Sequence, residues 1–132
     1  MRFSKRFLKM AAAGSALLLL GLAGCGKAAG YQQMTMDEAR QWMQENEGFA
    51  LVDVRTPEEY AEGYIPGAVN LPLDTIGETP DPALPNLEQT ILVYCRSGNR
   101  SKTAAARLAE QGYTHIIEIG GIRDWPDPLA LP

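Results

Sequence analysis

The chain has few cysteines, few histidines and no excess of basic residues. It contains only two cysteines, Cys25 and Cys95, and a single histidine, His115. One pair of cysteines is too few for the disulfide framework of small secreted domains. Acidic residues outnumber basic ones by 16 to 12, which gives a net charge of −4. Because nucleic-acid binding usually requires a basic face, we do not expect nucleic acid as a partner.

The first 24 residues differ from the remainder in charge and hydropathy. Basic residues at positions 2, 5, 6 and 9 precede the uncharged stretch Met10 to Leu22, which is shorter than the ~20 apolar residues needed to cross a bilayer. The sequence Leu22-Ala23-Gly24-Cys25 resembles the lipobox of bacterial lipoproteins. The pattern predicts a lipoprotein signal peptide over residues 1–24, with cleavage before Cys25 and lipid attachment at Cys25. The alternatives are an ordinary signal peptide with an incidental cysteine, or a short N-terminal anchor.

The lipoprotein interpretation sets expectations for the rest of the chain. Residues 25–33 would be the lipidated cysteine and a flexible tether, because Gly26 to Gly30 holds mostly small residues. Residues 34–132 would form the single folded domain, more acidic than the whole chain. We expect an exported protein, lipid-anchored to the cell envelope on its periplasmic or extracytoplasmic face. A lipidated Cys25 would leave Cys95 without an intramolecular disulfide partner.

Strand and helix signals alternate after residue 34. Apolar runs at 49–54, 91–94 and 116–119 predict strands, and residues 68–71 predict a short one. Thr35 and Thr56, each followed three residues later by glutamate, begin predicted helices, and a third helix is expected over 101–111. The proline-rich segment 74–87 is expected to be irregular. This order predicts an α/β sandwich with a central, mainly parallel sheet flanked by helices.

Reactive side chains concentrate in one loop, between the strand at 91–94 and the helix at 101–111. Residues Cys95 to Ser101 supply a thiol, two guanidinium groups, a glycine and hydroxyl groups. Cations, a helix N-terminus and converging N–H groups favour the reactive thiolate. The loop contains no histidine or carboxylate, so we expect electrostatic activation without a general base. The alternative is a buried, inert cysteine at a strand end.

An ordered set of motifs resembles the rhodanese family of single-domain sulfurtransferases. The matching residues are Leu51-Val52-Asp53-Val54-Arg55, Thr56-Pro57-Glu58-Glu59-Tyr60, Ile65-Pro66-Gly67-Ala68 with Asn70 and Pro72, Cys95 to Ser101, and Gly120-Gly121-Ile122 with Trp125. Two positions depart from the family pattern. Tyr64 stands where a histidine is common, and Pro126 would shorten any helix after the glycines.

The resemblance implies that Cys95 takes sulfane sulfur from a small anionic donor such as thiosulfate, forms a persulfide, and passes the sulfur to a thiol or protein acceptor. It implies a monomeric enzyme without cofactor or metal. Gly98 is expected to curl the loop so that N–H groups of residues 96–100 point at the sulfur.

Side-chain roles around the loop stay partly open. Arg96, with Arg100 and Lys102, is expected to attract the anionic donor, and Ser97, Asn99 and Ser101 would donate hydrogen bonds to sulfur or hold the loop. Arg100 either binds the donor or pairs with Asp53 as structural support. Arg55 either lines the cavity or pairs with Glu58 or Glu59. His115 is expected at the start of a strand, away from the chemistry.

Two other functions fit parts of the pattern. A cysteine phosphatase or arsenate reductase also places cysteine, loop N–H groups and arginine around an anion. Such loops have five residues between cysteine and arginine, whereas here four lie between Cys95 and Arg100, which favours a single sulfur atom over a tetrahedral phosphate. A non-catalytic sulfur carrier or redox sensor would keep the same loop without turnover.

Overall fold

The computed structural model describes residues 30–132, which form one α/β unit around a five-stranded sheet. The strand order is β1-β5-β4-β2-β3, and all neighbouring strands are parallel. The strands are β1 (Gln32–Gln33), β2 (Ala50–Asp53), β3 (Val69–Asn70), β4 (Thr90–Cys95) and β5 (His115–Gly121). The expected α/β sandwich with a parallel sheet is confirmed. The predictions for residues 1–24 and for Cys25 lie outside the described residues.

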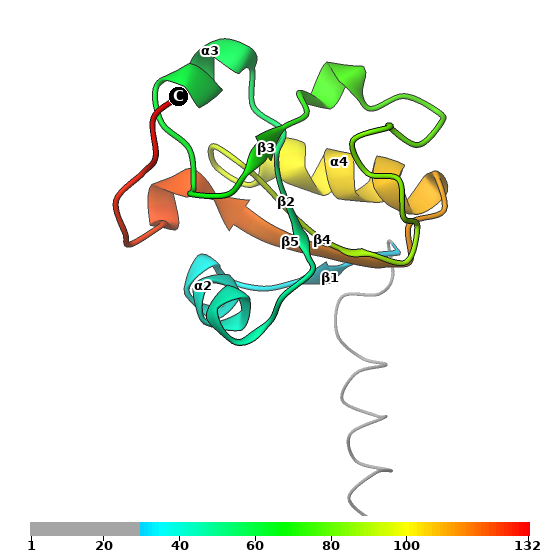
Figure 1. Ribbon diagram of the computed structural model, residues 1–132. Helices are drawn as coiled ribbons and strands as arrows, with labels where there is room; N and C mark the ends of the chain where they lie inside the picture. The colour runs from blue at the N-terminus through cyan, green and yellow to red at the C-terminus, as the bar shows by residue number, and fades with distance from the viewer. Residues whose placement is uncertain (1–29) are drawn as a thin grey trace, which may run out of the picture.

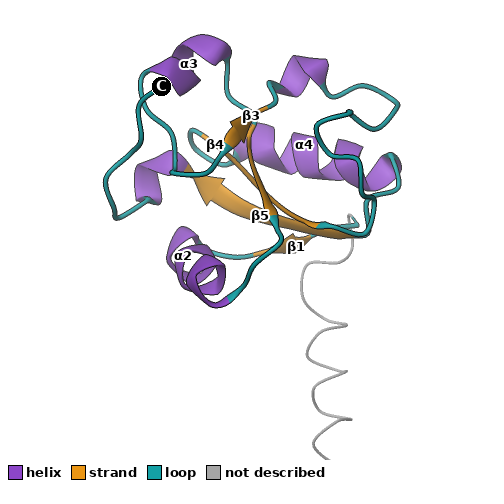
Figure 2. Cartoon of the chain, viewed as in Figure 1, coloured by secondary structure: helices purple, strands orange, loops and turns teal. Residues whose placement is uncertain are grey.

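Helices cover both faces of the sheet (Figures 1 and 2). They are α2 (Met36–Glu45), α3 (Pro57–Ala61) and α4 (Asn99–Glu110), with single turns η1 (Leu73–Thr75) and η2 (Ile122–Asp124). The apolar face of α4 packs with Val93 and Ile116 in one buried cluster. The apolar face of α2 packs with Leu92 and Ile119 in the other. Successive residues of β4 and β5 therefore point to opposite cores, which requires the near-continuous apolar runs seen in the sequence.

Local signals explain where the helices begin and end. Both predicted capping boxes are present, with Thr35 beginning α2 and Thr56 beginning α3. The segment 74–87 contains no regular element beyond the end of η1. Pro126 follows a single turn, η2, as expected. The helix predicted over 101–111 begins two residues earlier, at Asn99, because Gly98 takes the N-cap position.

Strand β1 was not expected from the sequence, because its two residues lie within the predicted tether 25–33. It has only two residues and pairs with β5 at the edge of the sheet, so it carries no alternating pattern long enough to be recognised. Among residues 30–132, no helix is sufficiently long and apolar to cross a bilayer.

Candidate active site

Cys95 is the last residue of β4, at the carboxyl end of the parallel sheet. Its side chain is buried, and the residue is 1% exposed. Residues 96–98 form a short loop from which α4 starts directly. In open parallel sheets, binding sites form at this end of the strands. The fold therefore places the thiol where a strand end, a loop and a helix N-terminus meet.

Gly98 gives the loop its curvature and a direct backbone hydrogen bond to sulfur. Its backbone has φ +102°, a left-handed conformation that glycine adopts at little cost. Its N–H donates to Cys95 Sγ at 3.0 Å. The next residue begins α4, so the positive end of the helix dipole lies close to the thiol.

The surroundings of the thiol favour its ionised form. Burial acts to raise the pKa of Cys95, but hydrogen bonding with the Ser101 side chain and with the N–H groups of Ser101, Gly98 and Ser97 outweighs burial. The pKa therefore lies below the ordinary value. This agrees with the electrostatic activation expected from the sequence.

Close packing of β5 against the loop depends on Gly121. A Cβ on Gly121 would overlap the carbonyl of Arg96 and approach Ser97 Cα at 2.7 Å. The pairing of β4 with β5 also shifts register between Val93 and Cys95, a bulge of the kind common beside active sites. The bulge and the glycine together bring β5 against the cysteine loop.

A buried carboxylate lies behind Cys95, and the sequence analysis missed it. Glu118 of β5 is 2% exposed, and its Oε2 accepts a 2.5 Å hydrogen bond from Ser101 Oγ. Ser101 Oγ lies 3.5 Å from Cys95 Sγ. The loop itself carries no carboxylate, and β5 supplies this one from outside the loop. The available signal was a glutamate inside the apolar run 116–119.

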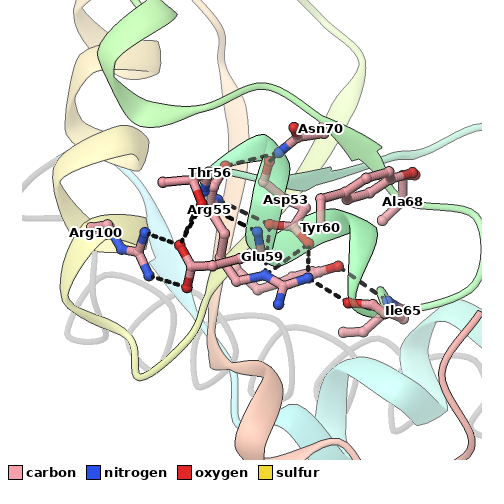
Figure 3. A network of polar contacts seen from close by, with 11 residues as sticks. Asp53, Arg55, Thr56, Glu59, Tyr60, Ile65, Ala68, Asn70 and Arg100 are labelled. Atoms are coloured by element: carbon pink, nitrogen blue, oxygen red, sulfur yellow. Dashed lines mark hydrogen bonds and ion pairs between the residues drawn. The ribbon is translucent and has the colours of Figure 1, made fainter. Parts of the chain in front are cut away.

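Arg100 binds Glu59 of α3, so the alternative in which it pairs with Asp53 does not hold. Its guanidinium donates to both carboxylate oxygens of Glu59, at 2.7 and 2.9 Å (Figure 3). The hydrogen bond from Arg100 lowers the pKa of Glu59 to about 2. The Arg100 side chain is 34% exposed, so the pair closes the loop while part of the arginine still faces solvent.

Arg55 is a buried structural residue rather than part of a cavity wall. Its guanidinium donates to both Asp53 oxygens, at 2.7 to 3.0 Å, and to the carbonyl of Gly63 at 2.7 Å. Figure 3 shows this pair beside the Arg100–Glu59 pair at the carboxyl end of β2. Arg55 is 6% exposed, so neither a substrate-binding role nor the alternative pairing with Glu58 or Glu59 describes its position. Asp53 has a structural role, as expected, but the arginine that it holds is Arg55 and not Arg100.

The remaining loop side chains face outward. Arg96, Ser97 and Asn99 are exposed, as is Lys102 on the first turns of α4. Ser101 is fully buried against Cys95. His115 is exposed at the first position of β5. Within residues 30–132, no three His, Cys, Asp or Glu side chains gather in an arrangement that could hold a metal ion.

Comparisons with known proteins show which family the chain resembles. The family model described as Rhodanese-like domain matches residues 35–127. The chain is 41% identical over 81 residues to the thiosulfate sulfurtransferase PspE of Escherichia coli (strain K12), covering 61% of this chain and 74% of that protein. It is 37% identical over 108 residues to a sulfurtransferase of Allochromatium vinosum, covering 76% and 95%. A solved structure, a rhodanese with anions from E. coli, has 37% identity and a TM-score of 0.58, covering 63% of this chain and 98% of that one.

Proposed function

Because the chain belongs to the rhodanese-like domain family, we propose that it is a sulfurtransferase that moves sulfane sulfur from thiosulfate to a thiophilic acceptor through a persulfide on Cys95. The observation that carries the proposal is the contact between the Gly98 N–H and Cys95 Sγ at the N-terminus of α4. The relatives named as sulfurtransferases support the reaction class.

The chemistry consists of two displacements at sulfur. The Cys95 thiolate attacks the outer sulfur of thiosulfate, a new S–S bond forms, and sulfite leaves with the electron pair of the broken S–S bond. Cys95 then carries a persulfide anion. An acceptor nucleophile attacks the terminal sulfur, and the electron pair of the persulfide bond returns to Cys95. Splitting one transfer into two steps in this way is covalent catalysis.

Each group in the loop has a defined task in this reaction. The Gly98 N–H and the N-terminus of α4 stabilise negative charge on sulfur before and after transfer. The exposed cations Arg96 and Lys102 attract the anionic donor. Arg100, fixed by Glu59, shapes the loop and adds positive charge near the thiol.

The test is intact-mass analysis of the full chain carrying Cys25→Ala, in which Cys95 is the only thiol. Treatment with thiosulfate should add one sulfur atom, and cyanide should then remove it as thiocyanate. The matched variant with Cys95→Ser as well should gain no sulfur and keep its circular dichroism spectrum. The proposal fails if Cys95 gains no sulfur from either thiosulfate or polysulfide. A carrier without turnover would gain the sulfur but release no more than one thiocyanate per chain.

We also propose that the protein is exported and held at the cell envelope by a lipid on Cys25. This proposal rests on the basic segment, the uncharged stretch and the lipobox-like sequence before Cys25. A domain held near a membrane suits transfer of sulfur to a nearby thiol or protein acceptor.

A further inference from the structure

The buried carboxylate of Glu118 is not used by the sulfur-transfer scheme, yet it is connected to the nucleophile. It is 2% exposed and lies in the middle of β5. Three donors hold it: Gln33 Nε2 at 3.1 Å, the Gly120 N–H at 2.8 Å and Ser101 Oγ at 2.5 Å. A buried carboxylate with several donors is fixed in one orientation, and one of these donors contacts Cys95 Sγ.

Ser101 has one hydroxyl hydrogen and two neighbours that can accept it. One is Glu118 Oε2 at 2.5 Å and the other is Cys95 Sγ at 3.5 Å. While Glu118 is ionised, the short charge-assisted bond directs the hydrogen to Glu118. The Ser101 oxygen then presents a lone pair to sulfur and accepts a hydrogen bond from the Cys95 thiol.

Ionisation of the thiol is therefore coupled to the state of the carboxylate. If the Cys95 proton passes to Ser101 Oγ and the Ser101 proton passes to Glu118 Oε2, both hydrogen bonds remain and only their direction reverses. Ser101 then donates to the thiolate and accepts from the carboxylic acid. The pair keeps one negative charge in both states, so no second charge is buried.

From this geometry we propose that Glu118 is a positioning residue for sulfur transfer, which stores through Ser101 the proton that Cys95 releases when it becomes the attacking thiolate. The inference rests on the proposed function, because it assigns the proton released by the same nucleophile. The S–H bond breaks, an O–H bond forms on Glu118, and the attack on sulfur proceeds as described above. No oxidant or reductant is needed.

The other charged groups around Glu118 make different contacts. Glu38 of α2, Lys102 of α4 and Asp124 of η2 line the groove beside it, and β1 contributes only the neutral Gln33. Within the described part of the chain, none of these three charged side chains hydrogen-bonds to Ser101 or Cys95. On the other side of the loop, Arg100 is bound to Glu59. Glu38 therefore offers a matched control: a carboxylate on the same groove without the link to sulfur.

The test is the rate of alkylation of Cys95 by iodoacetamide over about pH 4 to 10, a range that spans the ordinary pKa values of glutamate and cysteine. In the full chain with Cys25→Ala, the alkylation rate should rise in two steps. Cys95 and Glu118 share one proton after the first proton is lost, and the second step follows the loss of that shared proton. Glu118→Gln removes the proton store without changing shape and should lose the lower step. Ser101→Ala keeps the Glu118 carboxylate but breaks the hydrogen-bonded link to Cys95, so this variant should also lose the lower step.

Glu38→Gln should keep both steps, which separates the linked carboxylate from a general effect of nearby charge. A single-step profile in the parent chain, or an unchanged two-step profile in Glu118→Gln, would overturn the inference. Circular dichroism and thermal unfolding of each variant establish that the fold is retained, and Ser101→Ala gives a second route if Glu118→Gln does not fold. Alkylation needs no sulfur donor, so a two-step profile in a protein that gains no sulfur from thiosulfate would count against the proposed function alone.

Discussion

Gly98 shows how the backbone conformation of a single residue shapes the surroundings of the thiol. Its left-handed backbone turns the chain between β4 and α4, and the same turn aims its N–H at Cys95 Sγ. A side chain would meet no close obstacle, because the nearest atom to an added Cβ is Gly120 Cα at 3.7 Å. The requirement for glycine is therefore conformational and not a matter of space.

Gly98→Ala should destabilise the fold by about 1 to 2 kcal/mol, the cost of a left-handed conformation in a residue with a Cβ. If the loop relaxes, the N–H moves away from sulfur, the pKa of Cys95 rises and alkylation at neutral pH slows. Denaturant unfolding and the alkylation rate measure the two effects. Gly77→Ala is the control, since Gly77 has no positive φ and open space around it. Equal stability of the two variants would contradict the argument.

Two ion pairs lock the elements that surround the site. Asp53 and Arg55, at the end of β2, form a buried pair that also binds the carbonyl of Gly63 after α3. Glu59 on α3 binds Arg100 on α4 and caps its own helix through Thr56. Helix α3 is thus tied to the sheet by one pair and to the cysteine loop by the other. It has only five residues and no buried side chain of its own, so its position depends on these contacts.

The Glu59–Arg100 pair should make stability depend on acid pH. Arg100 lowers the pKa of Glu59 to about 2. The pair therefore contributes fully to the free energy of unfolding above the ordinary glutamate pKa of about 4.3, and this contribution is lost as the pH falls toward 2. Glu59→Gln, which preserves a capping residue, should lower the free energy of unfolding by about 1 kcal/mol at neutral pH.

Denaturant unfolding of the parent chain and of Glu59→Gln between neutral pH and about pH 2 measures the difference. The two curves should converge as Glu59 becomes protonated in the parent chain. Glu58→Gln is the control, because Glu58 precedes Glu59 on the same helix and forms no ion pair with Arg100. A difference between the parent and Glu59→Gln that stays constant down to pH 2 would show that the pair contributes nothing specific.

The whole molecule combines an acidic domain with a local cluster of cations at the cysteine loop. The chain carries a net charge of −4, yet Arg96 and Lys102 are exposed beside the thiol. We therefore expect the anionic donor of the proposed reaction to approach this end of the sheet.

The proposed lipid anchor predicts the behaviour of the intact protein in cells. Cys25→Ala should move the protein from the membrane fraction to the aqueous fraction, because a lipidated cysteine is removed. Cell fractionation with immunoblotting measures the distribution. Cys95→Ser serves as the control, since it removes the other cysteine and leaves the sequence before Cys25 intact. Unchanged membrane retention of Cys25→Ala would contradict lipidation at this residue.

Sequence patterns predicted those parts of the fold that depend on neighbouring residues. The apolar runs of β2, β4 and β5 marked strands buried on both faces, and Thr35 and Thr56 marked two helix starts. The loop from Cys95 to Ser101 was recognisable because its thiol, cations and glycine are adjacent in the chain. Strand β1 was missed because two residues carry no periodic signal, and the start of α4 shifted because the glycine itself caps the helix.

Local order along the chain was sufficient to predict the parallel α/β architecture, the position of Cys95 at the end of a strand, and the family to which the motifs point. The contacts between polar and charged side chains became known only from the folded arrangement. Asp53 binds Arg55, Glu59 binds Arg100, and Glu118 reaches Cys95 through Ser101. The last two contacts join residues from different elements, 41 and 17 positions apart. Which acidic side chain pairs with which basic side chain depends on how the strands and helices pack. The spacing of residues along the sequence does not determine that packing.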